Sequence, residues 1–269
     1  MYNGVKVFDV HGHVSSPAAS RAWLAGLIAS NTSRKSPLAP GGNRSVGRGE
    51  GNLLSDEHFQ ATAKMHADFM MMGWMQPHLL NAWTTFVNDS IKKQVDFFPD
   101  RFIGAAQLPQ IATAPDLNHC IPELERCVNE LGFGAIYLSP EPSGDRKTPG
   151  MNEPYWYPVY EYAQKHDLPI IVHGTNCNDT RLYPIPENYQ VGFVWEQFLA
   201  MQLLSHSDVF DKFPDLRVCV CHAGGALNRF IKTDHHLGQR DTTKNLFFDT
   251  CVLDIPVLEA AIKQKGLTN

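Results

Sequence analysis

The chain has 269 residues, of which 43% are hydrophobic and 19% charged, a composition ordinary for a globular protein. There are 23 lysines and arginines against 28 aspartates and glutamates, and the net charge of −5 argues against a protein that binds nucleic acid without sequence preference through a basic surface. No apolar run approaches the roughly 20 residues that cross a bilayer, and the N-terminus has no basic segment followed by an apolar stretch. We therefore expect a cytoplasmic protein with no nucleic-acid or membrane partner, built as a single domain over residues 1–269.

Short apolar segments alternate with helical segments along the chain. We expect buried strands at residues 5–11, 69–74, 102–108, 133–139, 168–174, 216–225 and 246–251. Helices are expected at residues 17–30, 56–68, 80–97, 115–131, 154–166, 192–212, 225–237 and 255–265. Residues 31–54, rich in Gly, Ser, Pro and Arg, are expected to form either a disordered surface loop or a mobile lid. Strands that alternate with helices predict parallel βαβ units.

Two architectures fit this alternation: an open doubly wound sheet and a (β/α)₈ TIM barrel. The first strand ends in DVHGHV rather than in the Gly-rich phosphate turn of a dinucleotide-binding sheet. A barrel collects functional residues at the C-terminal ends of its strands, and the histidines described below fall there. The chain supplies seven strands and stops where an eighth would begin, so this interpretation predicts a truncated C-terminus or an unusual closure. The open sheet edges would favour a homo-oligomer, such as a dimer, in which another chain covers the gap.

Four histidines stand at the predicted strand ends. Asp9, His11 and His13 alternate along the end of the first strand, so their side chains should point to the same side, into the barrel. Two imidazoles about 7 Å apart at Cα can both reach one divalent ion. His173 closes the apolar run of the fifth strand and His222 that of the sixth, each before a glycine-containing turn. Ligation by His11, His13 and His173 would leave positions open for water or substrate, as catalytic zinc sites do.

Taken together, these segments resemble a known family. FDVHGH, IIVHG and VCVCHAGG resemble, in order and spacing, the motifs of the amidohydrolase superfamily. The resemblance is to the branch that contains aminocarboxymuconate-semialdehyde decarboxylase, γ-resorcylate decarboxylase and 4-oxalomesaconate hydratase. The segments AIYLSPEPSG, EPYWYPVYEYAQKHDLPIIVHG and NLFFDTCVLDIPVLE are most similar to the hydratase-like members, and the likeness covers nearly the whole chain.

The resemblance implies a metal-dependent (β/α)₈ barrel with one divalent ion, usually zinc. His11, His13 and His173 match the metal ligands of the family, and His222 matches the histidine that acts as acid or base beside the metal. The last ligand of the family is an acidic residue at the end of strand eight. That position has no counterpart here, because Asp249 and Asp254 lie on or after strand seven and do not match it.

Four other residues are weaker candidates for the site. Arg229, seven residues past His222, would suit a substrate carboxylate, although a surface arginine is an equal alternative. Tyr189, in the long loop expected after strand five, is a candidate donor to a developing oxyanion or else a packed loop tyrosine. Ser143 and Gly144, in the loop after strand four, are candidates for contact with a substrate carboxylate.

Three functions remain open from the sequence. The first is a lyase, hydratase or decarboxylase, on a small dicarboxylic or aromatic carboxylic acid, in which the metal holds water or a substrate oxygen and His222 moves a proton. The second is hydrolysis of an ester, lactone or amide by metal-bound hydroxide. The segment AIYLSPEP has no lysine, unlike the corresponding strand of dinuclear hydrolases in the superfamily, and this favours a single ion. The third is an inactive metal-binding relative, suggested by the missing eighth strand.

Overall fold

A computed structural model describes residues 9–12, 77–142, 146–174, 181, 188–226, 241–252 and 254–266. The strand predicted at 69–74, the helices predicted at 17–30 and 56–68, and the loop predicted at 31–54 lie outside these residues. Of the strand predicted at 5–11, only residues 9–11 are described, and they belong to no strand. Nearly all of the helix predicted at 225–237 also lies outside the described part of the chain.

Five parallel strands form one sheet in sequence order. They are β1 (Ala105–Ala106), β2 (Ala135–Leu138), β3 (Ile170–Val172), β4 (Val218–Val220) and β5 (Leu246–Phe248). Each lies within one of the last five predicted strands. Ile170 pairs with Ile136 on one side and with Val218 on the other, so apolar residues stand side by side across the sheet. All four residues of β2 are buried, as expected for a parallel strand covered on both faces.

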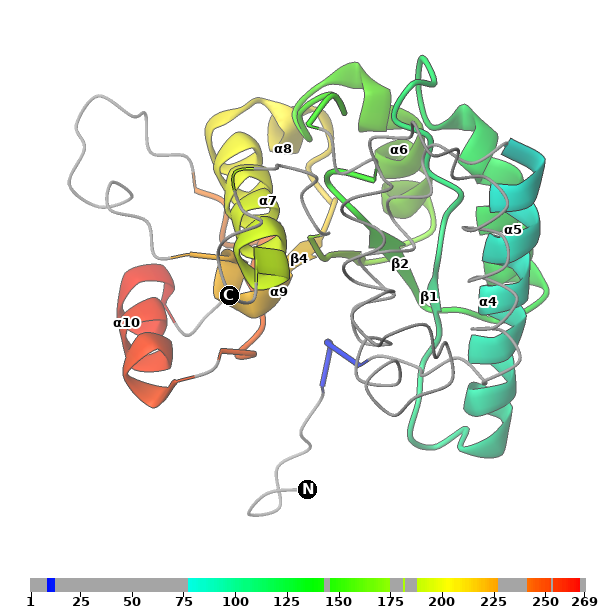
Figure 1. The fold of residues 1–269 in the computed structure, drawn as a ribbon, viewed down its shortest axis with the longest axis horizontal. Helices are drawn as coiled ribbons and strands as arrows, with labels where there is room; N and C mark the ends of the chain where they lie inside the picture. The colour runs from blue at the N-terminus through cyan, green and yellow to red at the C-terminus, as the bar shows by residue number, and fades with distance from the viewer. Residues whose placement is uncertain are drawn as a thin grey trace.

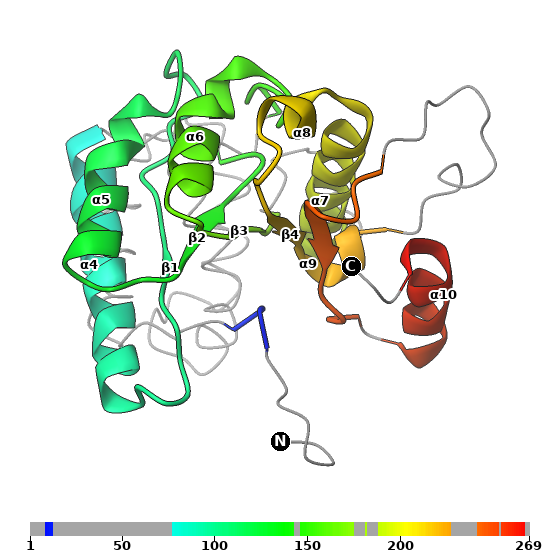
Figure 2. The same cartoon turned by 180° about the vertical axis from the view of Figure 1, so that it is seen from behind.

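Helices join and cover the strands. They are α4 (Pro77–Phe97), α5 (Ile121–Asn129), α6 (Tyr157–Lys165), α7 (Asn188–His206), α8 (Val209–Lys212), α9 (Cys221–Gly224) and α10 (Ile255–Lys265). Short 3-10 helices at Asn118–Cys120 and Pro154–Trp156 lead into α5 and α6. Figures 1 and 2 show α4 and α5 beside β1, α7 beside β4, and α10 set apart from the rest. Among the described residues, no helix is both long and apolar enough to cross a bilayer.

The core lies between the sheet and its helices. Trp156 and Tyr160 are fully buried there, and each polar group has a backbone partner. The Trp156 Nε1–H donates to the carbonyl of Pro149 at 2.9 Å, and the Tyr160 hydroxyl donates to the carbonyl of Met151 at 2.7 Å. These bonds fix the loop before α6 without leaving buried polar atoms unsatisfied.

Two predicted boundaries beside the site are wrong. The helix predicted at 192–212 is divided into α7 and α8, and α7 begins at Asn188, because residues 188–191 contain no proline or glycine to stop the helix there. Tyr189 therefore lies in a helix and not in a loop. The strand predicted at 216–225 ends at Val220, because the chain turns sharply at His222 and Ala223, which both have φ of 52°.

Candidate metal centre

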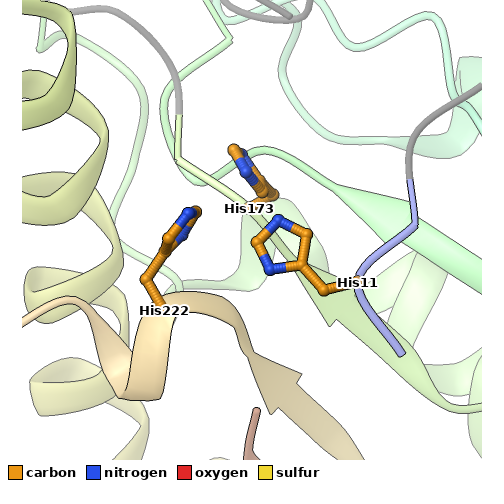
Figure 3. A group of neighbouring side chains, drawn as sticks. All are labelled: His11, His173 and His222. Carbon is orange, nitrogen blue, oxygen red and sulfur yellow. The ribbon is translucent and has the colours of Figure 1, made fainter. Parts of the chain in front are cut away.

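The C-terminal edge of the sheet gathers polar side chains from separate parts of the chain. His173 directly follows β3, His222 lies two residues after β4, and Asp249 directly follows β5. Parallel strands present their C-terminal ends at the same edge, so these three residues meet there. His11 approaches from the segment 9–12, and Figure 3 shows its ring beside those of His173 and His222.

The three imidazole rings form a compact group. Their ring centroids lie 4.9 Å apart for His11 and His173, 4.5 Å for His11 and His222, and 5.0 Å for His173 and His222. One nitrogen of each ring lies within 4.8 Å of the other two, close enough for a single ion to bind all three. The structure thus brings together three of the four histidines singled out in the sequence. His13 lies outside the described residues.

The hydrogen-bond partners of two rings determine where their protons lie. His173 is buried, and its Nδ1 lies 2.7 Å from the carbonyl oxygen of Gly174. His11 Nδ1 lies 2.6 Å from Oδ2 of Asp249. Both partners only accept hydrogen bonds, so the proton of each neutral ring resides on Nδ1 and the lone pair on Nε2.

His222 differs in its partner. Its Nδ1 lies 3.0 Å from Nε2 and 3.1 Å from Oε1 of Gln197, a fully buried residue of α7. An amide both donates and accepts, so this contact is compatible with either tautomer of the His222 ring. His222 and Ala223 also adopt left-handed backbone angles, which are costly for residues with a Cβ atom and concentrate at functional sites.

Close contact with α7 shapes both turns that follow the histidines. A Cβ atom on Gly174 would lie 2.1 Å from the backbone oxygen of Phe193, and one on Gly225 would lie 2.2 Å from that of Val194. The Phe193 ring packs against His173 and His222, with centroid distances of 5.6 and 4.7 Å. The glycines after the two histidines therefore allow α7 to seat directly on the site.

Asp249 belongs to the site, although it does not match the family's acidic ligand in the sequence. Burial alone would raise the pKa of its carboxyl group. Hydrogen bonds from His11 and from the Ala223 N–H outweigh that effect and hold the pKa below its usual value. The position of Asp249 at the end of a predicted strand was a usable signal, but the family's motif has no metal ligand there. Asp9, in contrast, is exposed and accepts the backbone N–H of His11 at 2.9 Å, so it does not point into the site as predicted.

Two further buried carboxyl groups, of Glu196 in α7 and of Glu141, lie close enough to influence each other. Glu196 and Glu141 are 4% and 3% exposed. Glu196 Oε1 lies 3.5 Å from Nε of Arg146 and has no hydrogen-bond partner in the described part of the chain. Burial, with a contribution from the negative Glu141, raises the pKa of Glu196 to about 7, and Arg146 opposes the shift. Glu196 follows Phe193 by three residues, so it lies on nearly the same face of the helix as the ring that covers the histidines. No sequence motif pointed to Glu196, Gln197 or Phe193.

The side chains of the remaining predicted site residues lie outside the described part of the chain. Ser143, Gly144 and Arg229 lie outside the described residues. Tyr189 is the second residue of α7, and its side chain is also outside the described part.

A parallel α/β fold with histidines gathered at its strand ends is the architecture of metal-dependent barrel enzymes. A family model described as Amidohydrolase matches residues 8–267. This chain belongs to the amidohydrolase family, whose fold is the (β/α)₈ barrel, and the five strands of the sheet are part of that barrel.

Three known proteins illustrate the relationship. The 2-keto-4-carboxy-3-hexenedioate hydratase of Sphingobium sp. is 37% identical over 65% of this chain and 52% of its own length. The crystal structure of 4-oxalomesaconate hydratase from Rhodopseudomonas palustris has a TM-score of 0.67 at 28% identity, over 95% of this chain and 77% of that one. A dihydroxybenzoic acid decarboxylase from Polaromonas sp., solved with bound manganese, has a TM-score of 0.52 at 24% identity, over 69% and 62% of the two chains. The chain spans about half the length of the curated relatives it matches.

The family is metal-dependent, and the donor set of this site fits a metal ion. Three imidazole nitrogens lie within 4.8 Å of one another and could ligate one ion. A carboxylate that is hydrogen-bonded to one of these rings is the usual outer partner of a ligating histidine.

Proposed function

We propose that this protein is a metal-dependent lyase that hydrates or decarboxylates a small carboxylic acid, with hydration the reaction to test first. The observation that supports the proposal is the division of the three histidines by their Nδ1 partners. His11 and His173 each face an acceptor, whereas His222 faces the amide of Gln197.

This division suits two different roles. A histidine whose proton is held on Nδ1 presents its Nε2 lone pair permanently, as a metal ligand must. A histidine that transfers protons must exist with and without the proton on Nε2. In both states the ring keeps its proton on Nδ1, and the Gln197 oxygen can accept a hydrogen bond from it without placing a full negative charge beside the ring. We therefore assign ligation to His11, His173 and, from the sequence motif, His13, and proton transfer to His222.

The donor set favours one zinc ion. Imidazole nitrogens suit zinc better than magnesium or calcium, which prefer oxygen ligands. When bound, the ion would supply Lewis-acid chemistry beside the substrate. The residues of the chain would do the remaining work: His222 would give or take a proton at Nε2, Gln197 would hold its ring, and Phe193 would cover both His173 and His222.

The names of the relatives support a carboxylic acid as the substrate. The two hydratases act on unsaturated acids with several carboxylates, as their names state, and the Polaromonas protein acts on an aromatic acid. We propose a small polycarboxylic acid, bound by Arg229, Ser143 and Gly144, with Tyr189 donating to a developing oxyanion. A cytoplasmic location and a homodimer remain predictions.

Replacing single histidines by alanine tests these assignments. We expect His11→Ala and His173→Ala to lose most of the bound metal. His222→Ala should retain it and lower turnover of 2-keto-4-carboxy-3-hexenedioate by about 10²- to 10⁴-fold, the usual contribution of a general acid or base. Metal is measured by elemental analysis of purified protein and turnover by loss of substrate absorbance.

His206→Ala is the matched control, because His206 is an exposed residue at the end of α7. It should change neither metal content nor rate. Equal loss of metal in His222→Ala and His173→Ala would make His222 a ligand, and wild-type protein inactive on every named substrate would contradict the lyase proposal.

A further inference from the structure

Asp249 forms hydrogen bonds both with the ring of His11 and with the turn that carries His222. Its Oδ2 accepts from Nδ1 of His11 at 2.6 Å. Its Oδ1 accepts the backbone N–H groups of Ala223 at 2.8 Å and of Cys251 at 3.2 Å. The carboxylate at the end of β5 therefore contacts the His11 ring and the left-handed turn that carries His222.

We propose that Asp249 is a positioning residue that fixes the tautomer and orientation of His11 and anchors the His222 turn. Asp249 accepts a hydrogen bond from the Nδ1–H of His11. The Nε2 lone pair of that ring is thereby directed to the side where His173 and His222 lie (Figure 3). By accepting a hydrogen bond from the Ala223 N–H, Asp249 stabilises a turn with two consecutive residues of positive φ, a conformation that is unfavourable for residues with a Cβ atom. This inference rests on the metal site of the proposed function and adds a residue that the family's ligand motif does not contain.

A direct ligand role is the competing interpretation. Ligand atoms of His11, Asp249 and Cys251 also lie within 4.8 Å of one another and so form a second possible metal group. An ion there would have to displace the Nδ1 proton of His11 and compete with the two N–H donors on Oδ1. A carboxylate already holding three hydrogen bonds is placed as an outer partner of a ligating histidine, and such partners typically contribute 10- to 100-fold to metal affinity or activity.

Asp249→Asn tests the proposal with little change of shape. The amide oxygen can keep the two N–H bonds of Oδ1, so the NH₂ group must face Nδ1 of His11. Nδ1 then has to accept, and the proton of the ring moves to Nε2. We expect the folded variant to show this tautomer change in the nitrogen chemical shifts of His11, assigned by comparison with His11→Gln. We also expect zinc affinity, measured with a competing chelator, to fall 10- to 100-fold.

Asp241→Asn is the matched control, because Asp241 is exposed, precedes β5 and, among the described residues, has hydrogen bonds only to Thr243 in its own turn. It should leave both readouts unchanged. A His11 ring with its proton on Nε2 in the metal-free wild type overturns the proposal, whether or not Asp249→Asn folds. So does an Asn variant that folds and binds zinc like wild type. If the wild type binds no zinc at all, the proposed function fails, and the nitrogen shifts of His11 still decide the role of Asp249.

Discussion

At the scale of single residues, Glu196 is a carboxyl group that the fold keeps out of water. It is 4% exposed, its pKa is raised to about 7, and its Oε1 has no hydrogen-bond partner among the described residues. In the unfolded chain the same group has a pKa near 4.5. Between these values the folded protein binds a proton that the unfolded chain has released, so the free energy of unfolding should decrease as pH rises from about 4.5 to about 7.

We predict that Glu196→Gln removes this dependence. The full shift corresponds to up to about 3 kcal/mol, so the variant should be more stable than wild type at pH 8 and similar to it at pH 4.5. Urea unfolding at the two pH values measures the difference. Glu161→Gln, at an exposed position on α6, is the control. A Glu196→Gln variant that loses stability at pH 8 would show that its pairing with Arg146 outweighs burial.

Residue types and spacing predicted part of the site. His11, His173 and His222 were recognisable because each is a polar residue that closes an apolar run. Gln197 and Phe193 were not recognisable, since they face the site only after α7 packs across it and no local pattern marks a helix residue for that role. Asp249 lay at a visible strand end, but its importance depends on a 2.6 Å contact with a residue 238 positions away.

At the scale of elements, the seating of α7 on the two glycine turns determines the shape of the site. Gly225 has φ of 83°, and an added Cβ would lie 2.2 Å from the Val194 oxygen and 2.6 Å from the Phe198 nitrogen. Neither atom can move without shifting the helix backbone. A side chain at this position therefore lowers the free energy of unfolding in two ways. It strains the backbone conformation, and it displaces α7 from His222.

We predict that Gly225→Ala lowers the free energy of unfolding by at least about 2 kcal/mol, because the left-handed conformation alone costs roughly 1–2 kcal/mol. Gly132→Ala separates the two contributions, since Gly132 has φ of 70° and nothing within 4 Å of an added Cβ. It should cost only the conformational part. Equal losses in the two variants, measured by urea unfolding, would contradict the close seating of α7.

Element types were predictable and element ends were not. The helix expected at 255–265 matches α10, which has a proline in its first turn and ends before Gly266. The helix expected at 115–131 is shorter, because a 3-10 turn at Asn118–Cys120 replaces its start. Each of the last five predicted strands is longer than the paired strand that the structure describes, since apolar runs continue beyond the ladder, as they do into the turns that carry His173 and His222.

At the scale of the whole molecule, the proposed metal would connect segments that are distant in the sequence. His11, His173 and His222 come from the N-terminal segment, the end of β3 and the turn after β4, and Asp249 ties His11 to the end of β5. The unfolded chain holds no such group of nitrogens together. A metal ion that binds only the folded state raises the free energy of unfolding, by an amount that depends on the ratio of the free metal concentration to Kd.

We therefore predict that removing the metal with a chelator lowers the Tm. With free zinc at 100 times Kd, the stabilisation is about 2.7 kcal/mol, which corresponds to about 5–10 °C for a chain of this size. Returning zinc should restore the Tm, and magnesium should not, because the donors are imidazoles. His173→Ala should melt at the same temperature with and without chelator. If the wild type gives up its metal and its Tm stays unchanged, the ion does not join these segments in the folded state, and the three histidines would need another explanation.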